Sequence, residues 1–421
     1  MSGSSIRRPR TRTLLLLCAP VLGLGLMQPG LSAERTRASA KTSDRIAFTA
    51  DEALAARPGG FSAGVRIPGD DPAAFTRLLA GAAAASEPWL VLSGGGENGA
   101  FAAGLLKGWS AAGTRPAFGV ITGVSTGAMI APFAFIGAAG DETLQRNYTA
   151  ISAADVFEFG GTTEALTDTW PLKQRIERAV TPALLAAIAA EHAKGRRLLV
   201  ATTALDAERP ILWDMGALAS LGGPKALALF RDIVLASSAV PGVFPPVMIE
   251  ATAGARTIRE MHADGGATAP YYLAPEAMLL AARPAALPTH RVYLVVNQAL
   301  SPQFQMATRT TLGILGRSLS AAIKAQTRVA LAVGRRFAKA TDLDLRIAEI
   351  DGRFTRTTTA PFDQDYMKAL FAHGEALGRA GTAFTGPEDP AGGTDLPAVS
   401  LTGAAGARAT GEGAVETLAG R

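Results

Sequence analysis

Short apolar runs alternate with segments of helical periodicity along the middle of the chain. Strands are predicted at Trp89–Leu92, Phe118–Ile121, Arg197–Thr203, Ile211–Trp213, Val292–Asn297 and Leu343–Ile350. Helices are predicted over Ala100–Ala112, Gly127–Ile136, Pro224–Ser237, Leu312–Ala340 and Asp363–Arg379. This alternation predicts an α/β fold, with a largely parallel sheet that helices cover on both faces.

The same pattern divides the chain into five segments. We predict a signal peptide (1–33), a weakly periodic N-terminal extension (34–87), an α/β body (88–300), a C-terminal extension of helices and one strand (301–382), and a disordered tail rich in glycine, alanine and threonine (383–421). Of the 421 residues, 48% are hydrophobic and 18% charged, so the chain can bury a sizeable core. This composition excludes a wholly disordered chain and a coiled coil.

The first 33 residues have the order of an export signal. A basic stretch (Arg7–Arg12) precedes an apolar run (Leu14–Met27), and Ala33 offers a small residue for cleavage. The run is shorter than the roughly 20 residues that span a bilayer, which favours cleavage over a retained anchor. Lipid attachment at Cys18, the only cysteine, is disfavoured because bulky Leu17 precedes it. We therefore predict an exported protein, periplasmic or secreted, with membrane association as a further possibility.

The net charge of +5 does not indicate a nucleic-acid partner. Four of these charges lie in the predicted signal, which contains no acidic residue, so the remaining chain carries a net charge of about +1. A nearly neutral body has no electrostatic reason to bind nucleic acid. After cleavage no cysteine remains, which excludes disulfides and thiolate metal sites.

A glycine-rich loop, Gly94-Gly95-Gly96-Glu97-Asn98-Gly99, lies where a predicted strand becomes a helix. A dinucleotide site would also need an acidic residue about 20 positions later, yet Asn98–Gly140 contains no Asp or Glu. The loop is then either an oxyanion hole built from backbone N–H groups or a plain glycine turn.

A second motif, Gly123-Val124-Ser125-Thr126-Gly127, lies between an apolar strand and an apolar helix. This is the setting of a nucleophile elbow, in which small neighbours hold a serine in a strained turn. The start of the following helix would favour negative charge that develops near Ser125.

A serine nucleophile needs a proton acceptor. Asp264, in the sequence Asp264-Gly265-Gly266, is the better candidate, at a loop tip from which a carboxylate reaches into a cleft; a simple Asp-Gly turn is the alternative. The chain has four histidines, of which His262 lies nearest to Asp264 in the sequence. We expect a packing or loop-capping role for His262.

A glycine loop, a G-x-S-x-G motif and a D-G-G motif in this order resemble the patatin-like phospholipases. Ala236–Pro246 is similar to a third block of that family, and Thr202–Asp206 with Trp213–Gly216 is similar to its bacterial members. The resemblance covers residues 88–300 and implies a three-layer αβα fold. It implies a Ser-Asp dyad of Ser125 and Asp264 that hydrolyses lipid acyl esters, with the N–H groups of Gly94, Gly95 and Gly96 as the oxyanion hole. The motif glycines are Gly99, Gly123, Gly127, Gly265 and Gly266.

The resemblance implies neither metal nor organic cofactor, a phospholipid or other acyl-ester lipid as substrate, and peripheral membrane contact. One position departs from the family, because Asn98 stands where an arginine or lysine is usual, and this leaves the head-group preference open. A less selective carboxylesterase and a non-catalytic envelope lipid-binding protein are the alternatives. The phenylalanines Phe133, Phe135, Phe157 and Phe159, together with Trp170, are candidates for an acyl channel. No strongly basic amphipathic helix stands out.

Overall fold

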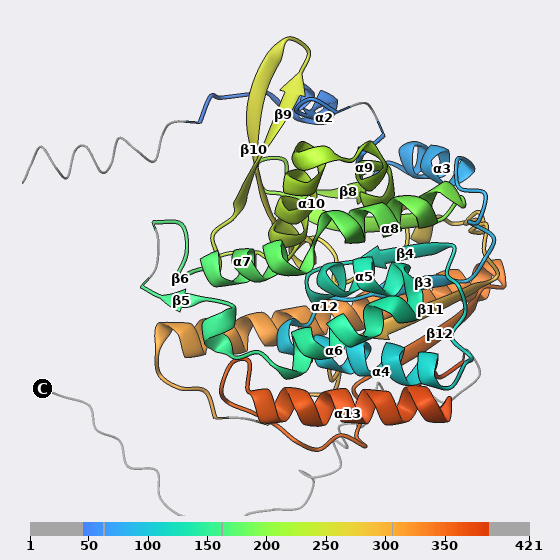
Figure 1. Cartoon of the computed structure of the whole chain (residues 1–421), viewed down its shortest axis with the longest axis vertical. Helices are drawn as coiled ribbons and strands as arrows, with labels where there is room; N and C mark the ends of the chain where they lie inside the picture. The colour runs from blue at the N-terminus through green and yellow to red at the C-terminus, as the bar shows by residue number, and fades with distance from the viewer. Residues whose placement is uncertain (1–44, 62–63, 161–162, 305, 387–421) are drawn as a thin grey trace, which may run out of the picture. The chain divides into compact units, whose positions relative to one another are not determined.

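The computed structural model describes residues 45–61, 64–160, 163–304 and 306–386 of the chain (Figure 1). The predicted signal peptide lies outside the described residues, as does most of the predicted tail. The chain divides into two compact units, Met1–Ile46 and Ala47–Arg421. All described helices and strands belong to the second unit.

Ten strands of the described residues form one sheet. Its order is β1-β9-β10-β7-β4-β3-β11-β12, and β8 pairs with β7 and β2 with β8. The strands from β7 to β12 along this order are parallel, whereas the pairs on the other side of β7 are antiparallel. The strands are β1 (Arg57–Pro58), β2 (Arg66–Pro68), β3 (Trp89–Leu92), β4 (Val120–Gly123), β7 (Arg197–Ala204), β8 (Arg209–Asp214), β9 (Val247–Ala253), β10 (Arg256–Asp264), β11 (Arg291–Val296) and β12 (Asp344–Glu349). A separate hairpin pairs β5 (Glu158–Phe159) with β6 (Thr167–Asp168).

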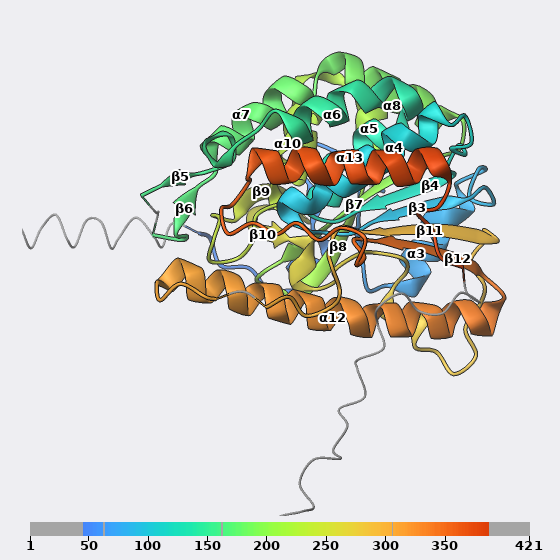
Figure 2. The same cartoon turned by 90° about the horizontal axis from the view of Figure 1, so that it is seen from below.

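Helices cover both faces of this sheet, so the three-layer α/β prediction is confirmed (Figure 2). One layer contains α4 (Gly99–Ala111), α5 (Thr126–Phe135), α6 (Asp141–Thr149), α7 (Trp170–Ala179), α8 (Pro182–Ala193), α10 (Gly223–Ser237) and α13 (Gln364–Ala380). The opposite face carries α3 (Pro72–Ala80) and α12 (Thr311–Thr341). The remaining helices are α2 (Ala50–Ala55), α9 (Met215–Leu221) and α11 (Glu276–Leu279). No helix within the described residues is both long and apolar enough to cross a membrane.

The central strands are apolar along their whole length because both of their faces are buried. Leu90 and Leu92 of β3 enter the core under α4 and α5, while Trp89 and Val91 enter the core shared with α3 and α12. All four side chains are fully buried. This double burial explains why these segments lack the alternation of a half-exposed strand.

The segment predicted as a C-terminal extension contributes to both the sheet and a helical layer. β12 extends the parallel sheet beside β11, and α13 packs closely on α4. Glycines make this approach possible: a Cβ at Gly104 would collide with the carbonyl of Phe371, and one at Gly378 with the carbonyl of Leu105. The two helices therefore hold this segment to the α/β body.

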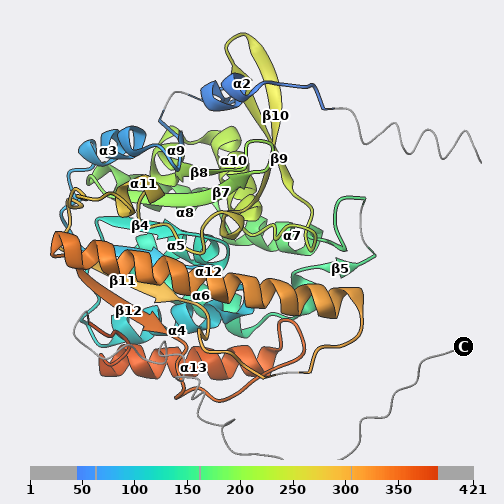
Figure 3. The same cartoon turned by 180° about the vertical axis from the view of Figure 1, so that it is seen from behind.

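The sequence pattern did not predict the β9–β10 hairpin, which extends from the sheet beside α2 (Figures 1 and 3). Its outer part is half-exposed, so the apolar pattern is weak, whereas its inner end pairs with β7. The hairpin matters for the site because β10 ends at Asp264.

Candidate active site

Ser125 occupies the sharp turn between β4 and α5, as the G-x-S-x-G motif predicts. Its backbone has φ 56° and ψ −125°, a region that non-glycine residues rarely enter. Gly127 makes the turn possible, since a Cβ there would collide with the carbonyl oxygen of Leu92. A strained serine at the carboxyl end of a buried strand and the start of a helix is the geometry of a nucleophile elbow.

A buried serine supports the elbow from behind. The N–H of Ser125 donates to Oγ of Ser237 at 3.0 Å, and this hydroxyl donates to the carbonyl oxygen of Ala201 at 2.7 Å. Ser237 is fully buried at the end of α10. The sequence motifs did not single out this residue, although it lies in the block Ala236–Pro246.

Asp264 lies next to Ser125, at the end of β10. The predicted loop tip is wrong in its local setting, because Asp264 is the last residue of a strand and is buried. Its N–H donates to the carbonyl oxygen of Ala239, and its Oδ1 accepts from the N–H of Gly266 at 2.7 Å. Burial raises the pKa of Asp264 to about 6, while hydrogen bonds from the Ser125 hydroxyl and the Gly266 N–H act in the opposite direction. The structure thus places the Ser125 side chain close enough to Asp264 to lower the pKa of this carboxyl.

The glycine loop lies on the other side of Ser125. Gly94 is its closest member, since a Cβ built there would lie 3.1 Å from Cβ of Ser125. The Gly94 N–H donates to the carbonyl oxygen of Pro270 at 3.0 Å, so it is already engaged. No described residue accepts a hydrogen bond from the N–H of Gly95 or Gly96. These two N–H groups are the ones that a developing oxyanion would find unoccupied.

Asn297, which follows β11, holds the glycine loop in place. Its side chain donates to the carbonyl oxygen of Ser93 at 3.0 Å, and its N–H donates to Oγ of Ser93 at 2.8 Å. A Cβ at Gly95 would collide with the carbonyl oxygen of Asn297, so this position requires glycine. The sequence signal for Asn297 is a polar residue at the very end of a buried apolar run, and on its own that signal does not point to the glycine loop.

Asn98 contacts the first turn of α13, and Glu97 contacts the segment that leads into this helix. The side-chain oxygen of Asn98 accepts from the Tyr366 hydroxyl at 2.8 Å. Burial raises the pKa of Glu97, partly offset by hydrogen bonds from the backbone N–H groups of Phe362 and of Glu97 itself. Asn98, which stands where the family usually has a cation, is therefore held by a neutral hydrogen bond from Tyr366.

The remaining motif glycines lie around these residues. Gly99 begins α4, and a Cβ there would collide with the side chain of Thr126. Gly123 ends β4, where a Cβ would meet the carbonyl oxygen of Gly127 at 2.5 Å, and Gly265 packs against the carbonyl group of Ala201. Close packing thus restricts each position to a residue without a side chain.

The four histidines have other contacts. His262 is fully buried, with Nδ1 3.0 Å from Oγ1 of Thr202, and its ring packs against Trp213. Burial lowers its pKa. No hydrogen bond among the described residues joins His192, His262, His290 or His373 to Ser125 or Asp264.

The aromatic candidates for an acyl channel separate into two groups. Phe133, Phe135 and Phe157 are buried core residues, whereas Phe159 and Trp170 are exposed. The Phe157 ring contacts Phe159, Phe244 and Phe362, with ring centroids 5.2, 6.0 and 6.2 Å away. Phe362 bonds Glu97 of the glycine loop through its backbone, so this aromatic cluster extends from the hairpin toward that loop.

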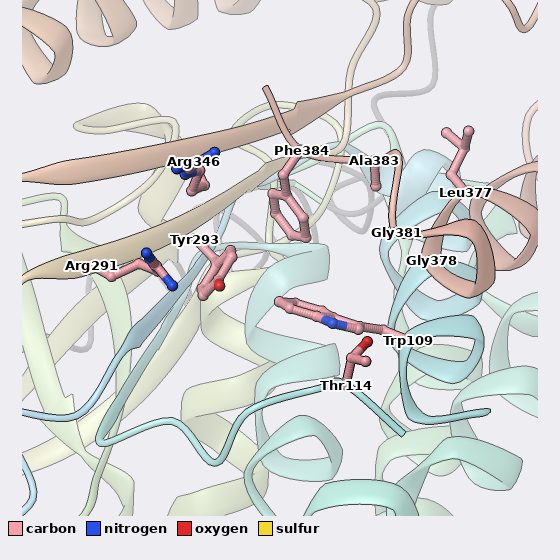
Figure 4. Close-up of a pocket in the computed structure, with 10 residues that line it drawn as sticks. All are labelled: Trp109, Thr114, Arg291, Tyr293, Arg346, Leu377, Gly378, Gly381, Ala383 and Phe384. Carbon is pink, nitrogen blue, oxygen red and sulfur yellow. The ribbon is translucent and has the colours of Figure 1, made fainter. Parts of the chain in front are cut away.

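A cavity of about 410 Å³ lies at the other end of the sheet (Figure 4). Arg291 begins β11, and Trp109 lies near the end of α4, so the cavity is at the amino ends of the parallel strands. Ser125 lies at their carboxyl ends, so the cavity is separate from the serine site. Among the described residues, no cluster of three or more His, Cys, Asp or Glu side chains is arranged to hold a metal ion.

The comparison with protein-family models agrees with the motifs. Residues 90–275 match the model of the patatin-like phospholipase family. Among solved structures, the chain is similar to VipD from Legionella pneumophila, with a TM-score of 0.36 and 10% sequence identity over 72% of this chain and 68% of that one. No curated protein matches the sequence. The matched segment includes the glycine loop, Ser125 and Asp264, so residues 90–275 form a patatin-like phospholipase domain of this chain.

Proposed function

We propose that the protein is an exported lipid acyl hydrolase, of phospholipase A or lysophospholipase type, with Ser125 as nucleophile and Asp264 as general base. The family match supports lipid acyl hydrolase activity in general. One observation carries the finer assignment: a strained serine contacts a buried carboxylate whose pKa is raised to about 6. Export rests on the predicted signal peptide.

In the first half-reaction, Oγ of Ser125 attacks the ester carbonyl carbon while Asp264 takes the hydroxyl proton. The N–H groups of Gly95 and Gly96 stabilise the charge on the carbonyl oxygen, and the positive end of α5 adds to this effect. The tetrahedral intermediate collapses as Asp264 gives its proton to the leaving alcohol oxygen, which leaves an acyl-serine. In the second half-reaction, water attacks the acyl carbon while Asp264 takes a proton from the water. Asp264 then gives this proton to Oγ of Ser125, and fatty acid is released.

Burial of Asp264 suits this role. An ordinary carboxylate with a pKa near 4 is a weak base at neutral pH, and a pKa of about 6 makes it stronger while keeping it ionised at pH 7 to 8. The base is still weak compared with an alkoxide, so the reaction depends on oxyanion stabilisation and on a reactive carbonyl. We therefore expect esters to be cleaved far better than amides.

The test compares fatty-acid release from mixed phospholipid vesicles with hydrolysis of a short-chain soluble ester. Wild type is measured beside Ser125→Ala and Asp264→Ala, with Ser220→Ala as a control because the Ser220 hydroxyl bonds only its own helix. We expect both site variants to lose turnover while they stay folded, and Ser220→Ala to keep it. A preference for vesicles would support a phospholipase, and a preference for the soluble ester a general carboxylesterase. Full activity in either site variant would overturn the proposal.

A further inference from the structure

Residues 301–341, which comprise α12 and the segment before it, contain seven arginines and lysines and no acidic residue. Arg317 and Lys324 lie on α12 beside half-buried leucine and isoleucine side chains, on a helix that the sequence pattern did not single out as strongly basic and amphipathic. Burial lowers the pKa of Lys324, and the charges of Arg317 and Arg328 lower it further. Cations are therefore concentrated on one stretch of this helix.

The first half of α12 extends beyond the body of the domain. Of its side chains that the structure describes, none is buried before Thr327. Gln326, near the middle of the helix, donates to the carbonyl oxygen of Thr268, four residues after Asp264. From that point back to Thr311 the helix continues for 15 residues, or about 22 Å. The half of α12 that precedes Gln326 thus begins beside the segment that follows Asp264.

Large apolar side chains are exposed at this end of the molecule. Phe304 is 93% exposed and Met306 79%, in the segment before α12, and Ile314 in its first turn is 56% exposed. Exposed apolar side chains are costly in water when they gather in one region, and such a region usually marks a contact with a partner or a membrane.

The β5–β6 hairpin adds a second exposed apolar element. Phe159 on β5 is 70% exposed, and Leu166 and Trp170 flank β6. The N–H groups of Leu166 and Thr167 donate to the carbonyl oxygens of Gly242 and Val243, in the block that contacts Asp264. Figures 1, 2 and 3 all place this hairpin at the same end of the sheet as the start of α12.

We propose that the first half of α12 and its preceding segment form a docking face for an anionic lipid bilayer, and that the β5–β6 hairpin, which carries Glu158, Glu164 and Asp168 and no cation, adds only apolar contact at its edge. The proposal rests on the proposed function and names the surface on which it takes place. Apolar side chains would enter the acyl boundary while Arg309, Arg317 and Lys324 contact lipid phosphates, as in interfacial amphipathic helices. Both elements are tied by hydrogen bonds to segments around Asp264, so docking would place the lipid ester at the serine site.

The experiment uses the chain from Glu34, which keeps the whole unit Ala47–Arg421. Sedimentation with vesicles of phosphatidylcholine and phosphatidylglycerol measures binding, and hydrolysis of a short soluble ester without vesicles measures the intact site. We expect Phe304→Ser/Met306→Ser/Ile314→Ser to weaken vesicle binding at least about tenfold and to change soluble-ester hydrolysis less than about twofold. The matched control is Leu54→Ser/Leu221→Ser/Leu280→Ser, which removes three exposed apolar side chains from other elements.

A second variant, Arg309→Gln/Arg317→Gln, tests the charge. We expect it to weaken binding to anionic vesicles about tenfold and to leave binding to pure phosphatidylcholine unchanged. Unchanged anionic binding in both face variants, or an equal loss in the control, would overturn the docking face. Wild-type binding and hydrolysis, measured separately, distinguish the two proposals. If wild type binds vesicles through this face but hydrolyses neither ester, the proposed function fails while the docking face stands.

Discussion

The cavity and the serine site lie at opposite ends of the parallel strands, and the two are built differently. At the amino ends, a cavity of about 410 Å³ is lined by Arg291 and Arg346, and each of these arginines pairs with Asp344 at 2.6 Å. At the carboxyl ends, Ser125 is strained and Asp264 is buried with a raised pKa. Backbone strain at Ser125 and the raised pKa of Asp264 distinguish the end that we propose as the active site, whereas the size of a cavity does not identify one.

The largest expected effect comes from the nucleophile. Ser125→Ala removes the attacking oxygen and should lower kcat/KM for esters by at least about 10³-fold. Arg346→Ala, at the amino-end cavity, should change it by less than about twofold. Steady-state hydrolysis of the short soluble ester measures both. A large loss in Arg346→Ala would break the contrast between the two ends.

The pH profile sharpens the contrast further. If the ionised form of Asp264 is the base, as proposed, the pKa of about 6 that burial gives it predicts that kcat/KM falls about tenfold for each pH unit below about 6 and is level above it. Initial rates between pH 4 and 8.5 measure this limb. A profile that is level down to pH 4.5 would show that Asp264 is not the base.

The same pKa predicts a gain in stability when the carboxylate is removed. A folded-state pKa above the unfolded value of 3.8 means that stability is lost as the pH rises from about 4 to about 6. Asp264→Asn stays neutral, so at pH 8 it should unfold with a free energy up to about 3 kcal/mol higher than wild type, and at pH 4 with little difference. Urea unfolding at the two pH values checks this. An equal effect at both would contradict it.

A smaller effect is expected behind the elbow. Ser237→Ala removes the acceptor for the Ser125 N–H, so the strained turn relaxes and kcat should fall about tenfold with little change in KM. Ser238→Ala is a matched control, because it removes a neighbouring buried hydroxyl that does not bond the Ser125 N–H. The Ser238 hydroxyl donates to the carbonyl oxygen of Val234 at 3.1 Å and, at the longer distance of 3.4 Å, to the carbonyl oxygen of Ser125. Equal losses in the two variants would argue against a specific positioning role for Ser237.

The smallest effect concerns the neutral contact at the glycine loop. Tyr366→Phe removes the hydroxyl that bonds Asn98, and we expect a two- to fivefold loss of kcat/KM with stability lowered by about 1 kcal/mol. Ester hydrolysis and thermal unfolding measure the two quantities. A loss as large as that of Ser237→Ala would mean that this contact positions the oxyanion donors more directly than a single hydrogen bond to Asn98 implies.

The sequence predicted the elements whose pattern is local. Trp89–Leu92 is a strand with the predicted bounds, and the helix after Ser125 begins at Thr126, one residue before the predicted Gly127. Both follow from continuous apolar runs that end in glycine. The β9–β10 hairpin was missed because its outer part is half-exposed, and Asp264 was therefore placed on a loop instead of at the end of a strand.

The supporting residues could not be predicted because they depend on contacts across the sheet. Ser237 reaches Ser125 from 112 positions away, and Asn297 reaches Ser93 from 204 positions away. The engagement of the Gly94 N–H by Pro270 likewise depends on tertiary packing. The stretch without acidic residues around α12 was present in the sequence, but the sequence analysis did not single out this helix, because which of its side chains are exposed depends on the fold.

The most direct test of the dyad is covalent labelling with a fluorophosphonate at pH 8, located by mass spectrometry of peptides. We predict one label per chain, on Ser125, and a rate that falls at least about a hundredfold in folded Asp264→Asn. A label on another serine, or an unchanged rate in Asp264→Asn, would contradict the assignment of these two residues.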